Sequence, residues 1–229
     1  AGTNVIGKAR LVTATGDEIT NDTKDAAKTD EVITKTVSAL KAITAVAADV
    51  QSKSSELDIS GQVKLVSVII NHAKDNANAS VGQGTEYVVQ VSHKATGDRD
   101  WVALDSWAAA ITAPSSVATD AEEAAGQTVI ECGATVPAVG DITFFKNATI
   151  ANSEWANVIA RVTTAGSETF TIEDGLTTAQ AASTYFTQGE RYAKSFDVRG
   201  FLRLRVVANN TKGTTNRAIV WECTAEAVT

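Results

Sequence analysis

The amino-acid sequence predicts an all-β protein: an antiparallel, jelly-roll-like β-sandwich interrupted by a small inserted β-barrel module and preceded by an extended N-terminal arm. Three observations favour this class. Small and β-branched residues are abundant in the 229-residue chain and aromatic residues make up only 6%, a composition that suits pleated, half-buried surfaces. Apolar residues alternate with polar ones along several runs. Short clusters of Gly, Asn and Asp separate these runs, as turns do.

The N-terminal segment is polar and rich in turn formers. Its stretch "TATGDEITNDTKDAAKTDE" carries too few apolar residues for a core of its own. We expect residues 1–35 to form an extended arm, of a kind that a neighbouring subunit often orders. The start "AGTN" and the lack of Met fit a cytosolic product whose initiator Met was removed, and no apolar run predicts a signal peptide or a membrane span.

Residues 36–114 are predicted to form the first part of the sandwich. The segment "TVSALKAITAVA" (36–47) has apolar positions at helical spacing, yet its Thr and Val residues favour a strand, which we predict. The run "VKLVSVII" (63–70) is apolar on both alternating faces, which is typical of a central strand covered on each side. "GTEYVVQVSH" and "RDWVALDSW" flank the Gly-containing loop "KATGD" and predict a hairpin.

Residues 115–184 are predicted to be the inserted module. A connector of small and acidic residues, "AAAITAPSSVATDAEEAAGQ", precedes four short apolar runs, "TVIEC", "DITFFKN", "EWANVIARVTT" and "ETFTIEDGL". Their spacing of about ten residues is typical of a small barrel or sandwich. Long strands return in residues 185–229, where "KSFDVRGFLRLRVVANN" and "NRAIVWECTAEAV" are predicted to pair across "NNTKGTTN" and to complete the sandwich.

Charge is unevenly distributed along the chain. The net charge of −7 argues against nucleic acid as the partner, but residues 191–217 hold seven basic side chains and one acid, so the remainder carries −13. Such asymmetry suits docking between protein surfaces. Arg203 and Arg205 alternate with leucines, so we expect both guanidinium groups to project away from the core. Interface ion pairs are the first interpretation and a solvated strand face is the alternative.

No catalytic or ligand-binding motif stands out. The only two histidines, His72 and His93, neighbour no nucleophile motif. "GQGTEY" precedes a strand rather than a helix, so it does not predict a phosphate loop. Asp98, Asp100 and the stretch "DNAN" could supply oxygen ligands for Ca²⁺, but their spacing departs from the EF-hand pattern. We predict no catalytic residue, no metal site and no cofactor.

Three runs resemble the strand series of β-sandwich virion proteins from tailed bacteriophages: "SSELDISGQVKLVSVIIN", "GTEYVVQVSHKATGDRDWVALDSW" and "FLRLRVVANNTKGTTNRAIVWECTA". The stretch "VGDITFFKNATIANSEWANVIARVTTAGSETFTIEDGL" looks like the SH3-like barrel inserted in such proteins. The resemblance covers roughly residues 55–229 and rests on strand pattern. It implies a non-enzymatic capsid decoration or cement protein, made in the cytoplasm of the bacterial host and located on the capsid surface of the virion.

The resemblance also implies partners and contacts. The expected partner is the major capsid protein, and the expected state is a homo-oligomer, often a trimer, with no nucleic acid and no membrane. The expected contact residues are Ile6, Arg10 and Leu11 of the arm, Arg203 and Arg205, and Trp155 of the module. For Trp155, a place in the core of the barrel is the favoured alternative.

Two other classes stay open. A neck or tail component of the virion would use the same sandwich at low copy number. A carbohydrate-binding module would need Trp101, Trp107 or Tyr87 exposed in a row on one sheet face. An enzyme is the least favoured class.

Overall fold

The computed structural model describes most of the chain beyond residue 33. The described residues are 34–61, 63–74, 84–109, 116–119, 121–132, 137–164, 166, 168–181, 185–211 and 218–229. Lys35–Thr229 forms one compact unit. Nearly all of the predicted N-terminal arm therefore lies outside the described residues.

Within the described residues the fold is all-β, as predicted, with strands in two antiparallel sheets and one short 3-10 helix, η1 (Ile150–Asn152). The large sheet runs in the order β1 (Lys35–Val46), β14 (Ile219–Val228), β4 (Leu65–Lys74), β12 (Tyr185–Asp197), β9 (Ile142–Lys146), β10 (Glu154–Val162), β11 (Glu168–Ile172), β8 (Val129–Cys132), with β7 (Ser116–Ala118) also on β12. The second sheet runs in the order β2 (Gln51–Lys53), β13 (Arg203–Asn209), β5 (Glu86–Ser92), β6 (Trp101–Ala108), with β3 (Leu57–Asp58) also on β13.

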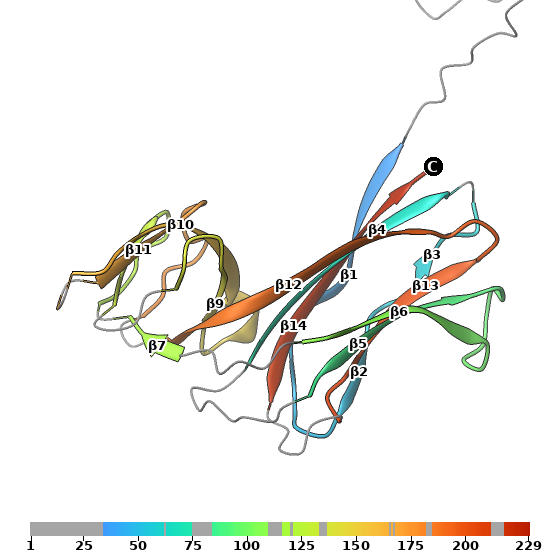
Figure 1. Ribbon diagram of the computed structural model, residues 1–229, viewed down its shortest axis with the longest axis horizontal. Coiled ribbons are helices and arrows are strands. Elements are labelled where there is room, and N and C mark those ends of the chain that lie inside the picture. The colour runs from blue at the N-terminus through green and yellow to red at the C-terminus, as the bar shows by residue number, and fades with distance from the viewer. Residues whose placement is uncertain are drawn as a thin grey trace, which may run out of the picture. The chain divides into compact units, whose positions relative to one another are not determined.

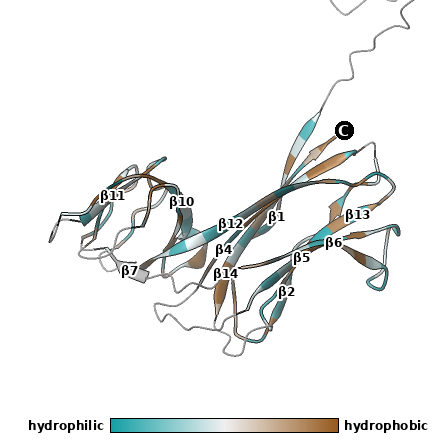
Figure 2. Cartoon of the chain, in the orientation of Figure 1, coloured by the Kyte–Doolittle hydropathy of each residue, from teal (hydrophilic) through white to brown (hydrophobic). Residues whose placement is uncertain are grey.

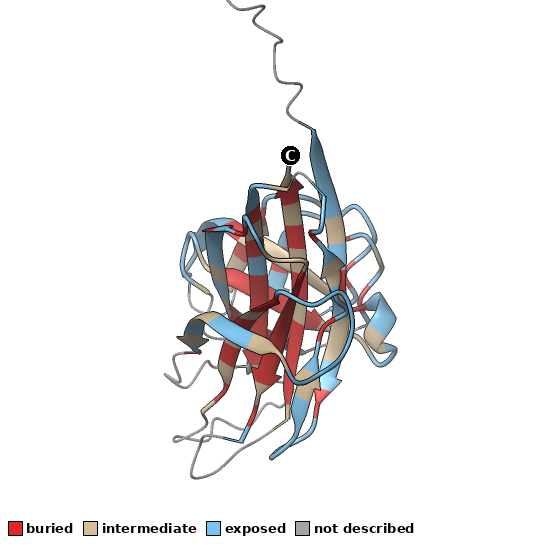
Figure 3. Cartoon of the chain, turned by 90° about the vertical axis from the view of Figure 1, so that its right-hand side faces the viewer, coloured by how far each residue is buried: buried red, intermediate tan, exposed pale blue. Residues whose placement is uncertain are grey.

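The sandwich forms where one end of the large sheet, strands β1, β14, β4 and the last part of β12, faces the second sheet (Figure 1). Inward-facing side chains of both sheets make one apolar cluster, in which Trp221, Tyr87, Ile70 and Leu204 are fully buried. Figure 2 shows the apolar segments of β13 and β14, and Figure 3 shows buried residues concentrated in the central strands. Alternation along each strand explains this core, because every second side chain faces the opposite sheet.

Strand β12 belongs to both parts of the molecule. Its first residues, Tyr185 to Gly189, pair with β9, and the following residues, Glu190 to Asp197, pair with β4. Strands β7 to β11 all fall within the predicted module, and with β12 they curl into a half-barrel. Its core is a cluster of aromatic and aliphatic residues separate from the sandwich core. Among them, the rings of Phe170 and Phe186 lie 4.9 Å apart.

Two of the predicted local features are confirmed. The ambiguous segment 36–47 is strand β1, and the predicted hairpin is the antiparallel pair β5–β6. The described strands β8 to β11 coincide with the four short apolar runs.

The predicted pairing of the last two long strands is wrong. Strand β13 lies in the second sheet between β5 and the short strands β2 and β3, whereas β14 lies in the large sheet between β1 and β4. The chain therefore crosses from one sheet to the other after β13. Both strands bury apolar residues in the same core, so alternation alone does not distinguish two facing strands from two paired ones.

The predicted cover on both faces of the central strand is also wrong. Strand β4 is central, between β14 and β12, and Val66, Val68 and Ile70 are buried on its inner face. On the outer face, Leu65 and Ile69 remain 46% and 39% exposed. These two residues have no covering layer within the described residues.

The change of partner along β12 depends on a glycine. A Cβ atom at Gly189 would lie 2.8 Å from Cζ3 of the Trp155 ring and 3.1 Å from the backbone oxygen of His72. We expect Gly189→Ala to lower the free energy of unfolding by about 1–3 kcal/mol, because the ring and the backbone would have to move apart. Urea denaturation measures this change. The control is Gly61→Ala, where the added Cβ meets nothing within 4 Å; an equal loss in both variants would contradict the prediction.

Candidate functional site

Arg203 and Arg205 are not the surface cations that the sequence predicted. Both lie on the face of β13 that points away from the sandwich core, as alternation predicted, yet they are only 8% and 7% exposed. Their guanidinium groups lie over the ring of Trp101, with centroid distances of 4.7 and 4.0 Å. Such cation–π contacts are stronger in a desolvated setting.

The partners of these arginines belong to the same chain. Arg203 donates to Glu56 Oε2 at 2.6 Å and to the backbone oxygens of Lys94 and Gly97 at 2.7 Å each. Arg205 donates to Gln90 Oε1 at 2.9 Å and to Asp98 Oδ1 at 3.0 Å. The two side chains thus hold the loop between β5 and β6 against the second sheet.

This arrangement corrects the prediction of interface ion pairs. The loop and Trp101 cover the guanidinium groups, and Asp98 and Glu56 already neutralise them. The hydrogen bond from Arg205 holds the pKa of Asp98 below its usual value. Arg203 and Arg205 are internal structural residues, and the loop that covers them comes from a distant part of the chain.

Trp155 does not lie in the core of the half-barrel, which was the favoured alternative to a contact with the capsid. It is half-buried and packs on Phe144, with ring centroids 4.6 Å apart, in a small cluster with Ala73 and Val220 of the large sheet. The core of the half-barrel is a different cluster. Trp155 therefore stands at the joint, where the module covers one end of the outer face of the large sheet. The predicted arm contacts, Ile6, Arg10 and Leu11, lie outside the described residues.

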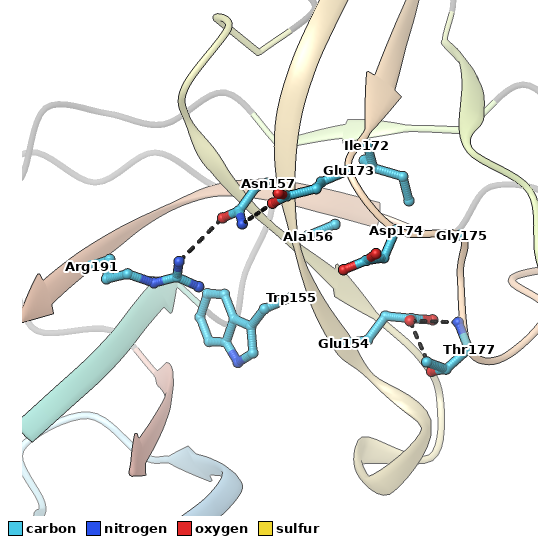
Figure 4. Close-up of a pocket in the computed structure, with 10 residues that line it drawn as sticks. All are labelled: Glu154, Trp155, Ala156, Asn157, Ile172, Glu173, Asp174, Gly175, Thr177 and Arg191. Carbon is cyan, nitrogen blue, oxygen red and sulfur yellow. Dashed lines mark hydrogen bonds between the residues drawn. The ribbon is translucent and has the colours of Figure 1, made fainter. Parts of the chain in front are cut away.

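A pocket of about 180 Å³ opens beside this joint (Figure 4). Arg191 of β12 occupies one side of it. Its Nε donates to Asn71 Oδ1 at 2.8 Å, and its Nη1 donates to Asn157 Oδ1 at 3.2 Å. Asn157 donates in turn to Glu173 Oε2 at 2.8 Å, and Asn71 donates to Glu222 Oε2 at 3.2 Å. This polar chain connects the sandwich to the module.

The remaining acids of the pocket differ in role. Glu154 accepts hydrogen bonds from the backbone and hydroxyl of Thr177, the backbone of Thr178 and the amide of Gln180. Its carboxylate is therefore committed to holding the loop after β11. Asp174 has no hydrogen-bond partner within the described part of the chain and borders the pocket in Figure 4. The pocket is a recess with many acceptors, built on a structural joint.

The aromatic row expected of a carbohydrate-binding module is not formed. Tyr87 is 1% exposed, and its hydroxyl bonds to Nδ1 of His72 at 2.8 Å. Trp107 is stacked between the rings of Tyr87 and Tyr192, at 5.3 and 5.5 Å. Trp101 lies under the two arginines. All three predicted platform residues thus serve internal packing.

Other side chains that the sequence offered for catalysis or metal binding have partners within the chain. His93 bonds to the backbone oxygen of Gly200 at 3.0 Å, and Asp100 pairs with Lys94 at 2.8 Å. Cys132 and Cys223 are buried free thiols. In the described ranges no group of three or more His, Cys, Asp or Glu side chains is placed to hold a metal ion.

The feature that the sequence analysis missed is the uncovered outer face of the large sheet. Cross-strand register places three rows of residues there, which we call the open face: Lys35, Val37 and Ala39 of β1, Thr224, Glu226 and Val228 of β14, Leu65, Ser67 and Ile69 of β4, and Ala193, Ser195 and Asp197 of β12. None of them is buried, and Val37 is 70% exposed. The signal was present in the apolar character of both faces of β4.

The open face is electrically balanced. Lys35 pairs with Glu226 at 3.0 Å, and Asp197 pairs with the neighbouring Arg199, whose hydrogen bonds lower the pKa of Asp197 to about 2. The other members of the face are small or apolar. At its centre the hydroxyls of Ser67 and Ser195 bond to each other at 2.7 Å. The outer faces of antiparallel sheets are commonly polar, so a neutral and partly apolar one indicates a contact surface.

Comparison with known proteins adds no family. No family model matches the chain, and it matches neither a curated protein nor a solved structure. In the part of the chain that the structure describes, no helix is long and apolar enough to cross a membrane.

The arginine cluster gives a testable ranking of stabilities. We expect Arg205→Met to lower the free energy of unfolding by about 2–3 kcal/mol, because a buried charge-assisted network loses its donor. Asp98→Asn should cost less than about 1 kcal/mol, because Asp98 is largely exposed. Urea denaturation checks both. Equal losses would show that the Arg205–Asp98 pair itself, rather than the buried contacts of Arg205, stabilises the loop.

The environment of Glu222 predicts that the stability of the fold depends on pH. Burial raises the pKa of this carboxyl in the folded protein, against the hydrogen bond from Asn71. Folding therefore favours the protonated form, and this contribution to stability is lost as pH rises from the unfolded pKa through the folded pKa. Glu222→Gln should consequently be more stable than the wild type at pH 7, with the difference shrinking towards pH 4. Thermal or urea unfolding across this range tests it. Glu226→Gln, which removes an exposed ion pair, should show no such gain.

Proposed function

We propose that this chain is a non-enzymatic structural protein of a tailed-bacteriophage particle, of the capsid decoration or cement type. It binds the assembled capsid and stabilises it through protein–protein contacts. The resemblance of its strand series to phage virion proteins supplies the class, and the open face is the observation that carries the proposal. The arm residues Ile6, Arg10 and Leu11 remain the proposed contacts with the major capsid protein.

The open face supports a contact role for a physical reason. Ile69 lies between Thr224 and Ala193 of the neighbouring strands, and Leu65 lies between Val228 and Asp197, whose charge is paired with Arg199. An apolar side chain left in water forgoes about 25 cal/mol for each Å² that burial would remove. A protein that works by docking recovers this free energy when the partner covers the face.

The burial of Arg203 and Arg205 also supports a contact role for the open face. Arg203 and Arg205 are buried and form ion pairs within the chain, so they do not form a basic patch for an anionic ligand. The described pocket beside Trp155 and Arg191 is part of the joint between sandwich and module. The described residues therefore support binding through a surface contact rather than in a cavity.

Copy number is the measurement that tests this function. Quantitative mass spectrometry of purified virus particles from the source should find the chain at a number comparable to the major shell protein. A decoration protein covers a shell of many repeated subunits, which requires many copies. A few copies per particle would instead favour a neck or tail component. Absence from particles would overturn both virion assignments.

A further inference from the structure

We propose that the open face is the contact between two copies of this chain, which pack sheet against sheet about a two-fold axis. From the proposed function the inference takes only the premise that this face makes a protein contact. It names the partner at that face as a second copy of the chain, and it makes the assembling unit a dimer in place of the trimer that the resemblance implies.

Charge is the first argument for a second copy. Each chain carries a net charge of −7, so two copies repel each other over most of their surfaces. The open face is an exception, because its charges are internally paired, Lys35 with Glu226 and Asp197 with Arg199. Two copies therefore meet with little repulsion there. A strongly basic partner would find no excess of negative charge on this face to attract it.

Complementarity is the second argument. In a two-fold contact the same patch serves both partners, so apolar residues of one copy cover those of the other. Leu65, Ile69 and Val37 would be covered on both copies by one contact. The small residues between them, such as Ser67 and Ala193, leave room for side chains of the facing sheet. Sheets that stack face to face lie about 10 Å apart with interdigitated side chains.

Continuity with a packed surface is the third argument. At the other end of the same outer face, Ala73 and Val220 are already covered, by Phe144, Ile150 and Trp155 of the module. Apolar side chains of the module therefore already pack on this side of the large sheet. The module covers one end of it and leaves the open face at the other end.

The free edge of β1 is a poorer candidate for the contact. Its pairing with β14 shifts register between Ala39 and Lys41 and again between Lys41 and Thr44. Irregularities and lysines of this kind discourage edge-to-edge pairing of sheets. The sheet face has regular register over its three rows, so the face is the surface suited to a defined contact.

Sedimentation velocity of the full chain over a range of concentrations tests the proposal. We expect a dimer, twice the 23.9 kDa of one chain. Ile69→Lys should weaken dimerisation at least tenfold, because two like charges would enter one apolar contact. Val162→Lys is the matched control, because Val162 is 52% exposed on β10 of the module and should leave the dimer intact. Urea denaturation of each variant verifies that it is folded, and Leu65→Gln replaces Ile69→Lys if that variant is not.

A cross-link locates the contact. Cys132 and Cys223 are buried, so a cysteine introduced by Ser67→Cys would be the reactive one at the centre of the open face. A bis-maleimide should join two copies through it, whereas the same reagent on Val162→Cys should not. A monomer, a trimer, a dimer that Ile69→Lys leaves unchanged, or equal cross-linking at both positions would each overturn the proposal.

The two proposals fail separately. A monomeric protein found in many copies per particle would overturn the dimer and leave the virion function standing. If the protein forms a dimer through the open face but is absent from virus particles, the dimer stands and the virion function is overturned.

Discussion

The hydrogen bonding of strand β12 is the constraint on which the rest of the described structure depends. The strand pairs with β9 up to Gly189 and with β4 from Glu190 onward, so the module and the sandwich share one continuous backbone. A strand fixed at both ends by its ladders leaves little freedom for a hinge. Trp155 packs against the glycine at the point where the partner changes, which no residue with a Cβ would permit without movement.

The shared strand decides which surfaces are covered. It brings Phe144 and Trp155 onto the outer side of the large sheet at one end, and the chain Asn71–Arg191–Asn157 fastens the same joint with hydrogen bonds. The module packs on this face only around Ala73 and Val220. The open face follows from this geometry, since the sheet continues beyond the reach of the layer that covers it.

Local pattern predicted the strands and the β5–β6 hairpin, but not the partners of the last two long strands. Alternation in "VKLVSVII" identified β4 and its central place, because side-chain direction follows from the backbone of one strand. The separation of β13 and β14 into facing sheets depends on contacts between distant segments, which alternation does not encode. Arg203 and Arg205 do point away from the core, as predicted, but Trp101 and the loop near Asp98 cover them. Cover of this kind is a property of the tertiary structure.

The cations of the basic segment show how composition can mislead about surfaces. Seven basic residues within 191–217 suggest a positive patch, yet five of them lie in the described chain and each has an internal partner. Lys194 pairs with Asp105 at 2.6 Å, and Arg191 donates to asparagines. Four of the five are thus neutralised by carboxylates and Arg191 is held by hydrogen bonds, so these cations stabilise the fold. Association of so acidic a protein then depends on surfaces where charge is balanced and apolar area is available, and the open face meets both conditions.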